Sequence, residues 1–174
     1  MIKIKIIPLE GIEIENIGKL LLGESKPNIK KLLGKPSVIS DKVQSYYDDY
    51  ELRIDFDKNG HAEFIEFIYG PFPEKTELEL YEINPFQIGA AQLVTLLSEK
   101  NNGKVDDWEA EYCYTFFNLS VGLWRQATEQ DVEDEMADMK ANNEYEENKE
   151  WLEEDLKKAK NFWTIGVGVK DYYK

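Results

Sequence analysis

Residues 52–69 read Leu-Arg-Ile-Asp-Phe-Asp-Lys-Asn-Gly-His-Ala-Glu-Phe-Ile-Glu-Phe-Ile-Tyr. The first five residues alternate between apolar and charged side chains, a pattern typical of a strand with one buried face. The Lys-Asn-Gly run at 58–60 predicts a tight turn, because Asn and Gly tolerate positive φ. Residues 61–69 then return as a second strand. The stretch therefore predicts an antiparallel β-hairpin within a sheet.

The residues around this hairpin extend it into a helix-plus-sheet unit. Ser25 is a suitable N-cap and Gly34 a suitable C′ residue, so a short helix is expected between them. Alternating segments at 46–50 and 78–80 predict a strand on each side of the hairpin. Residues 25–83 are therefore expected to form one helix followed by a four-stranded antiparallel meander.

The second half of the chain has a similar order of elements. A helix is expected over 84–101, and strands at 108–117, 119–123 and 163–169. Between the last two strands, residues 129–160 have helical periodicity. A straight helix of that length would span about 48 Å, which is longer than a small domain is wide. Either a break or bend near Asn142, or one end projecting from the domain, is therefore expected.

Together these patterns predict an α+β fold in a single domain, 1–174, built from two helix-plus-antiparallel-sheet repeats. Repeat one covers about 20–83 and repeat two about 84–174. The segment 129–160 would be a long acidic helical insertion near the C-terminus, replacing the short turn of the first repeat, because insertions in hairpin loops cost little. Ahead of the repeats, alternating residues 2–6 and 12–14 predict a pair of strands.

The first repeat carries a resemblance to known proteins. The run Gly23-x-Ser25, Leu32-Leu33-Gly34-Lys35-Pro36 and then Tyr50 to Gly60 resembles the helix-plus-sheet repeat of two groups. These are the β-lactamase inhibitor protein and the small lipoproteins of outer-membrane assembly. The resemblance implies a tandem-repeat fold and a partner-binding sheet. Two features of these groups are missing from the sequence: the single Cys113 permits no intrachain disulfide, and there is no lipoprotein signal. The resemblance therefore does not imply residence in the cell envelope.

Composition limits the classes of function. The 174 residues carry a formal net charge of −14, whereas a nucleic-acid binder needs a basic footprint to release counterions from phosphate. The same charge disfavours adsorption to an anionic membrane. No apolar run is long enough for a membrane span and the start has no signal-peptide pattern, so a cytoplasmic location is expected.

One metal-binding pattern is present. Asp55, Asp57, Asn59 and Glu66, together with Gly60, match the calcium loop of the EF-hand. An EF-hand needs a helix on both sides of this loop, and the flanks here alternate as strands. The favoured interpretation is a hairpin with these side chains on its solvent face, and a metal site at the four ligands is kept as an alternative.

The acidic segment offers two interpretations. Residues 129–160 contain 13 acidic and 5 basic side chains. In one interpretation the segment is a solvated face whose apolar side chains dock on the sheet, namely Met136, Met139, Leu152 and Leu156. In the other it is a steering surface for a basic partner. The sheet face opposite the core is expected to carry Glu109, Glu111, Ser120, Gly122, Trp124, Gly166, Gly168, Arg53 and Asp55. Trp124 is the large apolar side chain of this face, either as an interface anchor or covered by the helix. The glycines beside it would admit a close partner or let the acidic helix lie across the sheet.

No catalytic motif stands out, and no cofactor is expected. We predict a non-enzymatic, protein-binding module, in character an intracellular immunity protein or inhibitor that occludes a basic partner such as a nuclease toxin. The predicted partner-binding residues are Trp124, Glu109, Glu111, Asp55, Glu147 and Glu154. The alternative is a small enzyme or ligand-binding protein with a tyrosine-lined pocket, formed by Tyr46, Tyr47, Tyr112 and Tyr114.

Overall fold

The computed structural model describes residues 1–40 and 43–174. Within these residues the chain forms four helices and two sheets, which confirms the α+β class. In chain order the elements are β1 (Ile2–Ile7), β2 (Gly11–Ile14), β3 (Gly18–Leu21), α1 (Lys26–Leu33), β4 (Val38–Ser40), β5 (Gln44–Tyr47), β6 (Leu52–Phe56), β7 (Ala62–Phe67), β8 (Thr76–Glu79), α2 (Ala90–Asn101), β9 (Val105–Asp106), β10 (Cys113–Phe116), β11 (Val121–Trp124), α3 (Glu129–Ala141), α4 (Tyr145–Ala159) and β12 (Thr164–Gly168).

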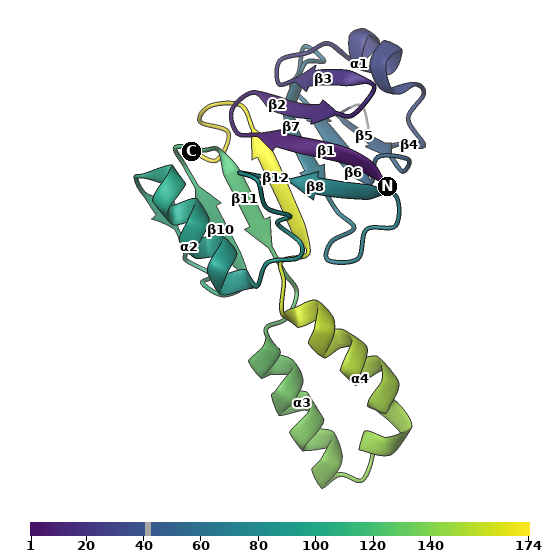
Figure 1. Ribbon diagram of the computed structural model, residues 1–174, viewed down its shortest axis with the longest axis vertical. Coiled ribbons are helices and arrows are strands. Elements are labelled where there is room, and N and C mark those ends of the chain that lie inside the picture. The colour runs from purple at the N-terminus through teal and green to yellow at the C-terminus, as the bar shows by residue number, and fades with distance from the viewer. Residues whose placement is uncertain (41–42) are drawn as a thin grey trace.

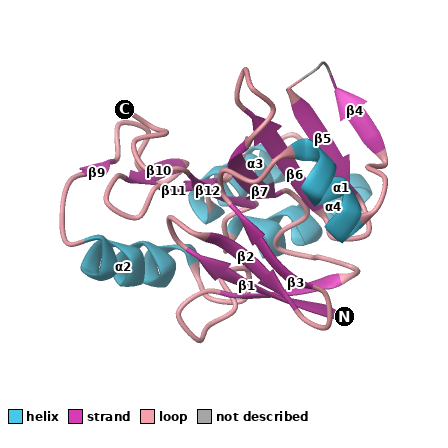
Figure 2. Ribbon diagram, turned by 90° about the horizontal axis from the view of Figure 1, so that it is seen from above, coloured by secondary structure: helices cyan, strands magenta, loops and turns pink. Residues whose placement is uncertain are grey.

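The two sheets form two layers. The large sheet has eight antiparallel strands in the order β4-β5-β6-β7-β12-β11-β10-β9, and the small sheet has the order β3-β2-β1-β8. The small sheet and α2 lie on the same side of the large sheet, the small sheet over β5–β7 and α2 beside β10 (Figures 1 and 2). One face of the large sheet is therefore covered by other elements, and the opposite face is the outer face.

One apolar core fills the space between the layers. Its fully buried side chains include Ile4 of the small sheet, Ile54 and Ile65 of the large sheet, and Leu93 of α2. The alternation in 52–56 produces this directly, since the apolar residues of β6 are buried and the charged ones between them are partly exposed. The predicted β6–β7 hairpin is confirmed, and so is the antiparallel pairing of β1 with β2.

The predicted helix after Ser25 is confirmed as α1. Pro27 lies in its first turn, and Gly34 ends it at a φ of 87° that favours glycine. Ile29 and Leu33 face the core. The Ser25 hydroxyl makes no cap hydrogen bond, although Ser25 stands at the N-cap position, and its backbone forms a β-bridge with His61.

The predicted meander is wrong in its last strand. β8 does not pair with β7 but crosses to the small sheet, where it lies parallel to β1. The buried Glu51 stabilises this crossing, because its carboxylate accepts hydrogen bonds from the backbone N–H groups of Glu74, Lys75 and Thr76 and from the Thr76 hydroxyl. Such long-range carboxylate bonds leave no periodic signal in the sequence.

Two boundaries in the second half also differ from the expectation. α2 begins at Ala90, because the Asn84 side chain accepts the N–H of Phe86 and forms a turn rather than a helix cap. The strand expected over 108–117 is confined to Cys113–Phe116. Residues 107–112 form consecutive turns instead, which begin where the Asp106 carboxylate accepts the N–H of Trp108.

The acidic segment is a pair of helices, α3 and α4, with a break at Asn142-Asn143 as predicted. The pair, which we call the helical hairpin, lies between β11 and β12, which are hydrogen-bonded neighbours. It extends away from the sheets (Figure 1). Its apolar residues form a separate small core, so the expectation that they dock on the sheet is wrong; that core includes Val132, Met136, Leu152, Ala159, Met139 and Leu156.

Among the described residues, no helix is both long and apolar enough to cross a membrane.

Candidate partner-binding surface

The outer face of the large sheet carries polar and aromatic side chains. The register places these residues on one row across the sheet: Tyr46, Arg53, Glu66, Gly166, Gly122 and Thr115. Trp124 lies on the same face, two residues after Gly122 on β11. Its register partners are Thr164 on β12 and Cys113 on β10. The expected placement of Arg53, Asp55, Trp124 and the three glycines on a face opposite the core is therefore confirmed for the strand residues.

The centre of this face is occupied by the chain itself. Tyr172 stacks on Phe64 at 4.7 Å between ring centroids, and Tyr173 packs edge-on against Tyr172 at 5.0 Å. The rings rest on glycines, and a Cβ at Gly122 would overlap the Tyr173 phenol. The expectation that these glycines admit a partner or the acidic helix is wrong, because Phe64 fills the space over Gly166, Tyr173 that over Gly122 and Tyr172 that over Gly168. Burial raises the pKa of Tyr173 far above its ordinary value.

Beside the tyrosines, Arg53 binds two carboxylates. Its Nε lies 2.9 Å from Asp55 Oδ1 and its Nη2 lies 3.0 Å from Glu66 Oε2. Burial raises the pKa of both Asp55 and Glu66, and the Arg53 guanidinium opposes that shift. Asp55, one of the predicted partner-binding residues, is thus already engaged with a cation of the same sheet.

The calcium-loop alternative is not supported by this geometry. Asp55 and Glu66 lie on adjacent strands and bind Arg53, whereas Asp57 accepts the N–H groups of Asn59 and His61 within the turn. Over residues 1–40 and 43–174, no group of three or more acidic, histidine or cysteine side chains is arranged to hold a metal ion. The sequence pattern matches because a β-turn and an EF-hand loop use the same Asp, Asn and Gly chemistry.

An open groove lies where the helical hairpin joins the sheet. We call it the tryptophan groove. It has a volume of about 640 Å³ and is lined by Trp108, Glu109, Ala110, Tyr112, Trp124, Arg125 and Gln126. The Trp108 side chain is 91% exposed and that of Trp124 is 43% exposed. The interpretation in which the acidic helix covers Trp124 is therefore wrong.

The two predicted glutamates of this region point to different places. Glu109 lines the tryptophan groove and also an adjacent recess of about 140 Å³ on the other side of Trp108. Glu111 has a φ of 79° and lines a separate pocket beside α2. The expectation that both glutamates lie on a strand face with Trp124 is wrong, because the strand begins only at Cys113.

Arg125 lines the groove but directs its guanidinium elsewhere. It is buried, donates to the carbonyl oxygens of Glu111 and Ala159, and lies over the Phe162 ring at 5.3 Å. These contacts tie the end of α4 and the 107–112 turns to the sheet. The cation therefore stabilises the base of the hairpin, and Glu109 is the acidic residue among those that line the groove.

The first turn of α3 is fixed by a capping box. The Thr128 hydroxyl accepts the Asp131 N–H, and the Asp131 carboxylate accepts the Thr128 N–H at 2.7 Å. The Tyr112 hydroxyl also donates to Asp131, at 2.8 Å. The hydrogen bonds from Thr128, and to a smaller extent the one from Tyr112, lower the pKa of Asp131. The same Tyr112–Asp131 hydrogen bond raises the pKa of Tyr112. The hairpin is thus anchored next to the groove.

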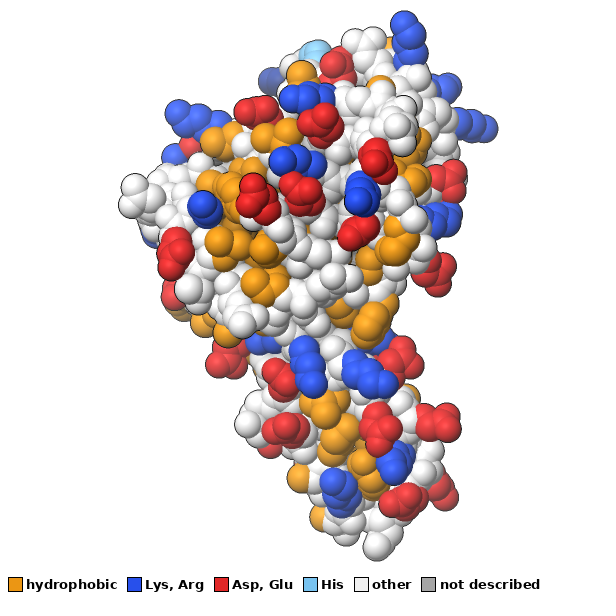
Figure 3. Space-filling model, viewed as in Figure 1, with side chains coloured by type: hydrophobic (Ala, Val, Ile, Leu, Met, Phe, Trp, Pro, Cys, Tyr) orange, Lys and Arg blue, Asp and Glu red, His pale blue; other side chains and the backbone are white. Residues whose placement is uncertain are grey.

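Most carboxylates of the hairpin have no cation beside them. In the described residues, its ion pairs join Lys149 to Glu153 and Lys158 to Glu154 and Asp155. Of the two predicted residues on α4, Glu147 is exposed and outside these pairs, whereas Glu154 lies 2.8 Å from Lys158. In Figure 3, apolar side chains follow the seam between α3 and α4, with acidic and basic side chains around them.

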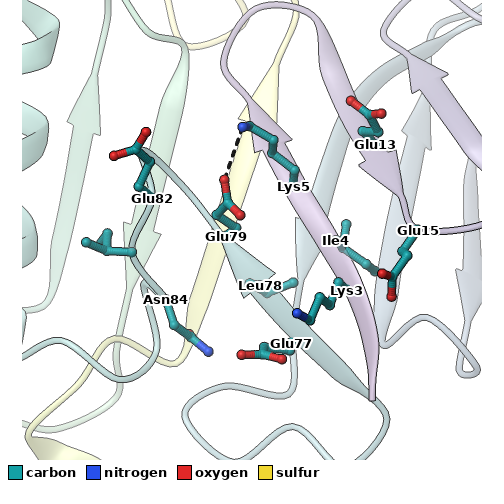
Figure 4. Close-up of a pocket in the computed structure, with 11 residues that line it drawn as sticks. Lys3, Ile4, Lys5, Glu13, Glu15, Glu77, Leu78, Glu79, Glu82 and Asn84 are labelled. Atoms are coloured by element: carbon teal, nitrogen blue, oxygen red, sulfur yellow. Dashed lines mark ion pairs between the residues drawn. The ribbon is translucent and has the colours of Figure 1, made fainter.

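The small sheet has a second acidic surface with a different arrangement. A pocket of about 360 Å³ on its outer face contains Lys3 and Lys5, which lie between carboxylates from β2 and the residue that follows it and carboxylates from β8 (Figure 4). Lys5 Nζ lies 3.1 Å from Glu79, and this hydrogen bond raises the Lys5 pKa. Figure 3 likewise shows acidic and basic side chains intermixed over the upper part of the molecule.

The predicted tyrosine pocket does not form. Tyr46 and Tyr47 are on β5, Tyr114 is on β10 and Tyr112 directly precedes it; five strand spacings separate β5 from β10, roughly 24 Å. Tyr47 is also buried in the core, on the opposite face from Tyr46. The four tyrosines therefore line no common cavity.

Cys113 is the chain's single cysteine. Burial, as the largest cause, and the negative charge of Glu109 both raise the pKa of its thiol, which opposes formation of a nucleophilic thiolate.

Comparison of the chain with protein-family models, with curated proteins and with solved structures finds no match.

Three residues of this surface escaped the sequence reasoning. The alternation in the sequence predicts a strand at Trp108 and predicts no element for Tyr172 and Tyr173. A signal for Trp108 was present, since the flanking Asp106, Asp107 and Glu109 favour an exposed turn. For the tyrosine pair the signal was only the glycine alternation of β12, which leaves room for aromatic rings without specifying which ones.

Proposed function

We propose that this chain is a non-enzymatic protein-binding module that occludes a basic protein partner. In character it would be an intracellular immunity protein or inhibitor, and a nuclease toxin is the kind of partner we favour. The proposal rests on one observation above the others. The helical hairpin carries 13 of the 35 acidic side chains, extends from the body, and keeps most of them outside ion pairs.

The isolation of the hairpin core supports this function over mere solubility. A helix that only solubilised the protein would gain stability by docking its apolar stripe on the sheet. Here α3 and α4 satisfy their apolar residues with each other and place the carboxylates around a projecting element. Such a field raises the association rate with a cationic protein and loses strength with salt.

We also propose that the two halves of the chain are repeats. The first half supplies α1 and then β4 to β7, and the second supplies α2 and then β9 to β12, with the two strand sets in mirrored order across the large sheet. In this alignment the helical hairpin stands where residues 58–60 turn in the first half. The antiparallel pairing of β11 with β12, which matches that of β6 with β7, supports the repeat alignment. The resemblance to the β-lactamase inhibitor protein would then extend to the sheet arrangement.

The mechanism would be occlusion. Carboxylates such as Glu147 would take the positions that substrate phosphates occupy on the partner, and Trp124 would pack at the root of the hairpin. Asp55 contributes less in this scheme, because Arg53 already neutralises part of its charge. The sheet centre under Tyr172 and Tyr173 lies outside the contact.

Affinity capture from the native host tests the proposal. The immobilised chain is expected to retain a protein of high isoelectric point, which is released as the salt concentration rises. A variant with glutamine or asparagine at 133, 134, 135 and 138 of α3 should retain less of this protein. The matched control carries Glu13, Glu15, Glu77 and Glu79 as glutamine, which removes the same number of charges from the small sheet. Retention of a strongly anionic protein, or an affinity that does not change with salt, would contradict the proposal.

A further inference from the structure

The tryptophan groove has a feature that neither the core nor the hairpin explains. Trp108 exposes 91% of its side chain although residues 107–112 are held in place. The Asp106 carboxylate accepts the Trp108 N–H at 3.2 Å, and the Tyr114 hydroxyl accepts the Glu111 N–H at 3.0 Å. An ordered turn thus presents an indole to solvent, and a large exposed aromatic group of this kind is typical of an interface anchor.

The second indole of the groove is also held in one orientation. Trp124 packs edge-on against Trp163, with 6.0 Å between ring centroids and an interplanar angle of 85°. The Trp163 backbone N–H donates to the Trp124 carbonyl oxygen at 2.8 Å. Trp124 therefore packs on Trp163 while 43% of the residue stays exposed. A ligand would meet two indoles that are already positioned.

The electrostatics of the groove favour a cation. Glu109 lines the groove, and Asp106 lines the adjoining recess beside Trp108. The one basic side chain among the lining residues, Arg125, directs its donors to backbone carbonyl oxygens, and its charge interacts with the nearby Asp131 carboxylate, which binds Tyr112 of the groove. Aromatic faces attract cations through their quadrupole, and a carboxylate at the edge adds a charge-assisted hydrogen bond.

We propose that the tryptophan groove binds an arginine side chain of the protein partner, with the guanidinium against the indoles of Trp108 and Trp124 and hydrogen-bonded to Glu109. The inference rests on the proposed function and names the contact that fixes the partner at the base of the hairpin. Arginine suits the groove better than lysine, because a planar guanidinium stacks on an indole and pairs with both oxygens of a carboxylate.

Short peptides test this site without the partner. The four indole N–H resonances of the ¹⁵N-labelled chain are followed by NMR during titration with acetyl-Gly-Gly-Arg-Gly-Gly-amide. The same peptide with citrulline at the centre keeps the shape and removes the charge. Arginine is expected to shift the Trp108 and Trp124 signals in a saturable way, lysine to bind roughly threefold more weakly, and citrulline to give no saturation.

The chain provides its own controls. Trp151 on α4 is 39% exposed among carboxylates but has no second indole facing it, so its signal should not saturate with the arginine peptide. Trp108→Ala removes an almost fully exposed side chain, leaves the fold intact and should abolish saturation. Glu109→Gln should weaken binding by about fivefold, whereas Glu77→Gln, at an exposed position of the small sheet, should leave it unchanged.

Several results would overturn the site. These are equal shifts with citrulline, an equal response at Trp151, or binding that survives Trp108→Ala. Equal affinity for the lysine peptide would overturn the choice of arginine. Failure here is distinct from failure of the proposed function, because salt-dependent retention of a basic partner that is insensitive to Trp108→Ala would preserve the proposed function and contradict the arginine site.

Discussion

The small sheet and the helical hairpin are both rich in carboxylates, but they arrange them differently. On the outer face of the small sheet, lysines of β1 and β3 lie across from glutamates of neighbouring strands, as in the pairs Lys5–Glu79 and Lys19–Glu13. On α3, six acidic side chains accompany a single lysine, Lys140, which lies over the ring of Tyr145. The small sheet therefore compensates part of its acidic charge with lysines, whereas α3 leaves most of its acidic charge uncompensated.

This difference shows that the number of carboxylates is a poor guide to a binding surface. A glutamate opposite a lysine in a sheet register contributes little field beyond its neighbour. Carboxylates at i, i+3 and i+4 of one helix add their fields and repel one another. The acidic composition of the chain therefore points to a basic partner only through the hairpin.

Glu51→Gln should give the largest effect, since Glu51 is a third kind of carboxylate, 3% exposed and hydrogen-bonded to backbone N–H groups rather than to a cation's side chain. Its oxygens accept from three backbone N–H groups and one hydroxyl, and an amide cannot accept all of them. The midpoint of thermal unfolding should fall by about 10 °C. Glu79→Gln, on the small sheet, should change it by less than about 2 °C. Equal effects would contradict the role of Glu51 in holding β8.

Thr128→Ala should give the next effect, at the base of the hairpin. Loss of the cap is expected to lower the midpoint of thermal unfolding by about 3 °C. Hydrogen exchange should accelerate in α3 and remain unchanged in the small sheet. Thr128→Ser, which keeps the hydroxyl, is the matched control. Exchange that accelerates equally in both regions would show that the hairpin is not anchored through this cap.

The same anchor should respond to pH at both ends of the scale. The Asp131 pKa is lowered from 3.8, so its contribution is complete above about pH 4 and is lost as the pH falls through the lowered value. The Tyr112 pKa is raised from 10.0, so its contribution is complete below about pH 10 and is lost as the pH rises through the raised value. Hydrogen exchange of α3 in Tyr112→Phe should lack the alkaline step, and persistence of that step would contradict the assignment.

Removing charge from the two surfaces should change stability in opposite directions. Glutamine or asparagine at 133, 134, 135 and 138 relieves repulsion on α3 and should raise the midpoint by about 2 °C at low salt. Glutamine at Glu13, Glu15, Glu77 and Glu79 leaves the lysines uncompensated and should lower it by about 2 °C. Both variants lose the same charge, so shifts of the same sign would erase the contrast between the surfaces.

The sequence predicted those parts of the structure that depend on neighbours in the chain. The β6–β7 hairpin, α1 and the break at Asn142 follow from alternation, caps and helix length. The parallel pairing of β8, the turns at 107–112 and the tyrosines over the glycines depend on contacts between distant segments, such as Glu51 with Thr76. For the candidate site, Trp124 and Glu109 were predicted, whereas Trp108 was not, because alternation continued through it.

The most direct test is the rate at which the captured partner associates with the two charge-removed variants, measured at about 50 mM and about 500 mM salt. Neutralising α3 should slow association by at least about tenfold at low salt and by little at high salt. Neutralising the small sheet should leave the rate within about twofold at either concentration. Equal slowing by both variants, or a rate that is the same at both salt concentrations, would contradict the claim that the uncompensated charge of the hairpin recruits the partner.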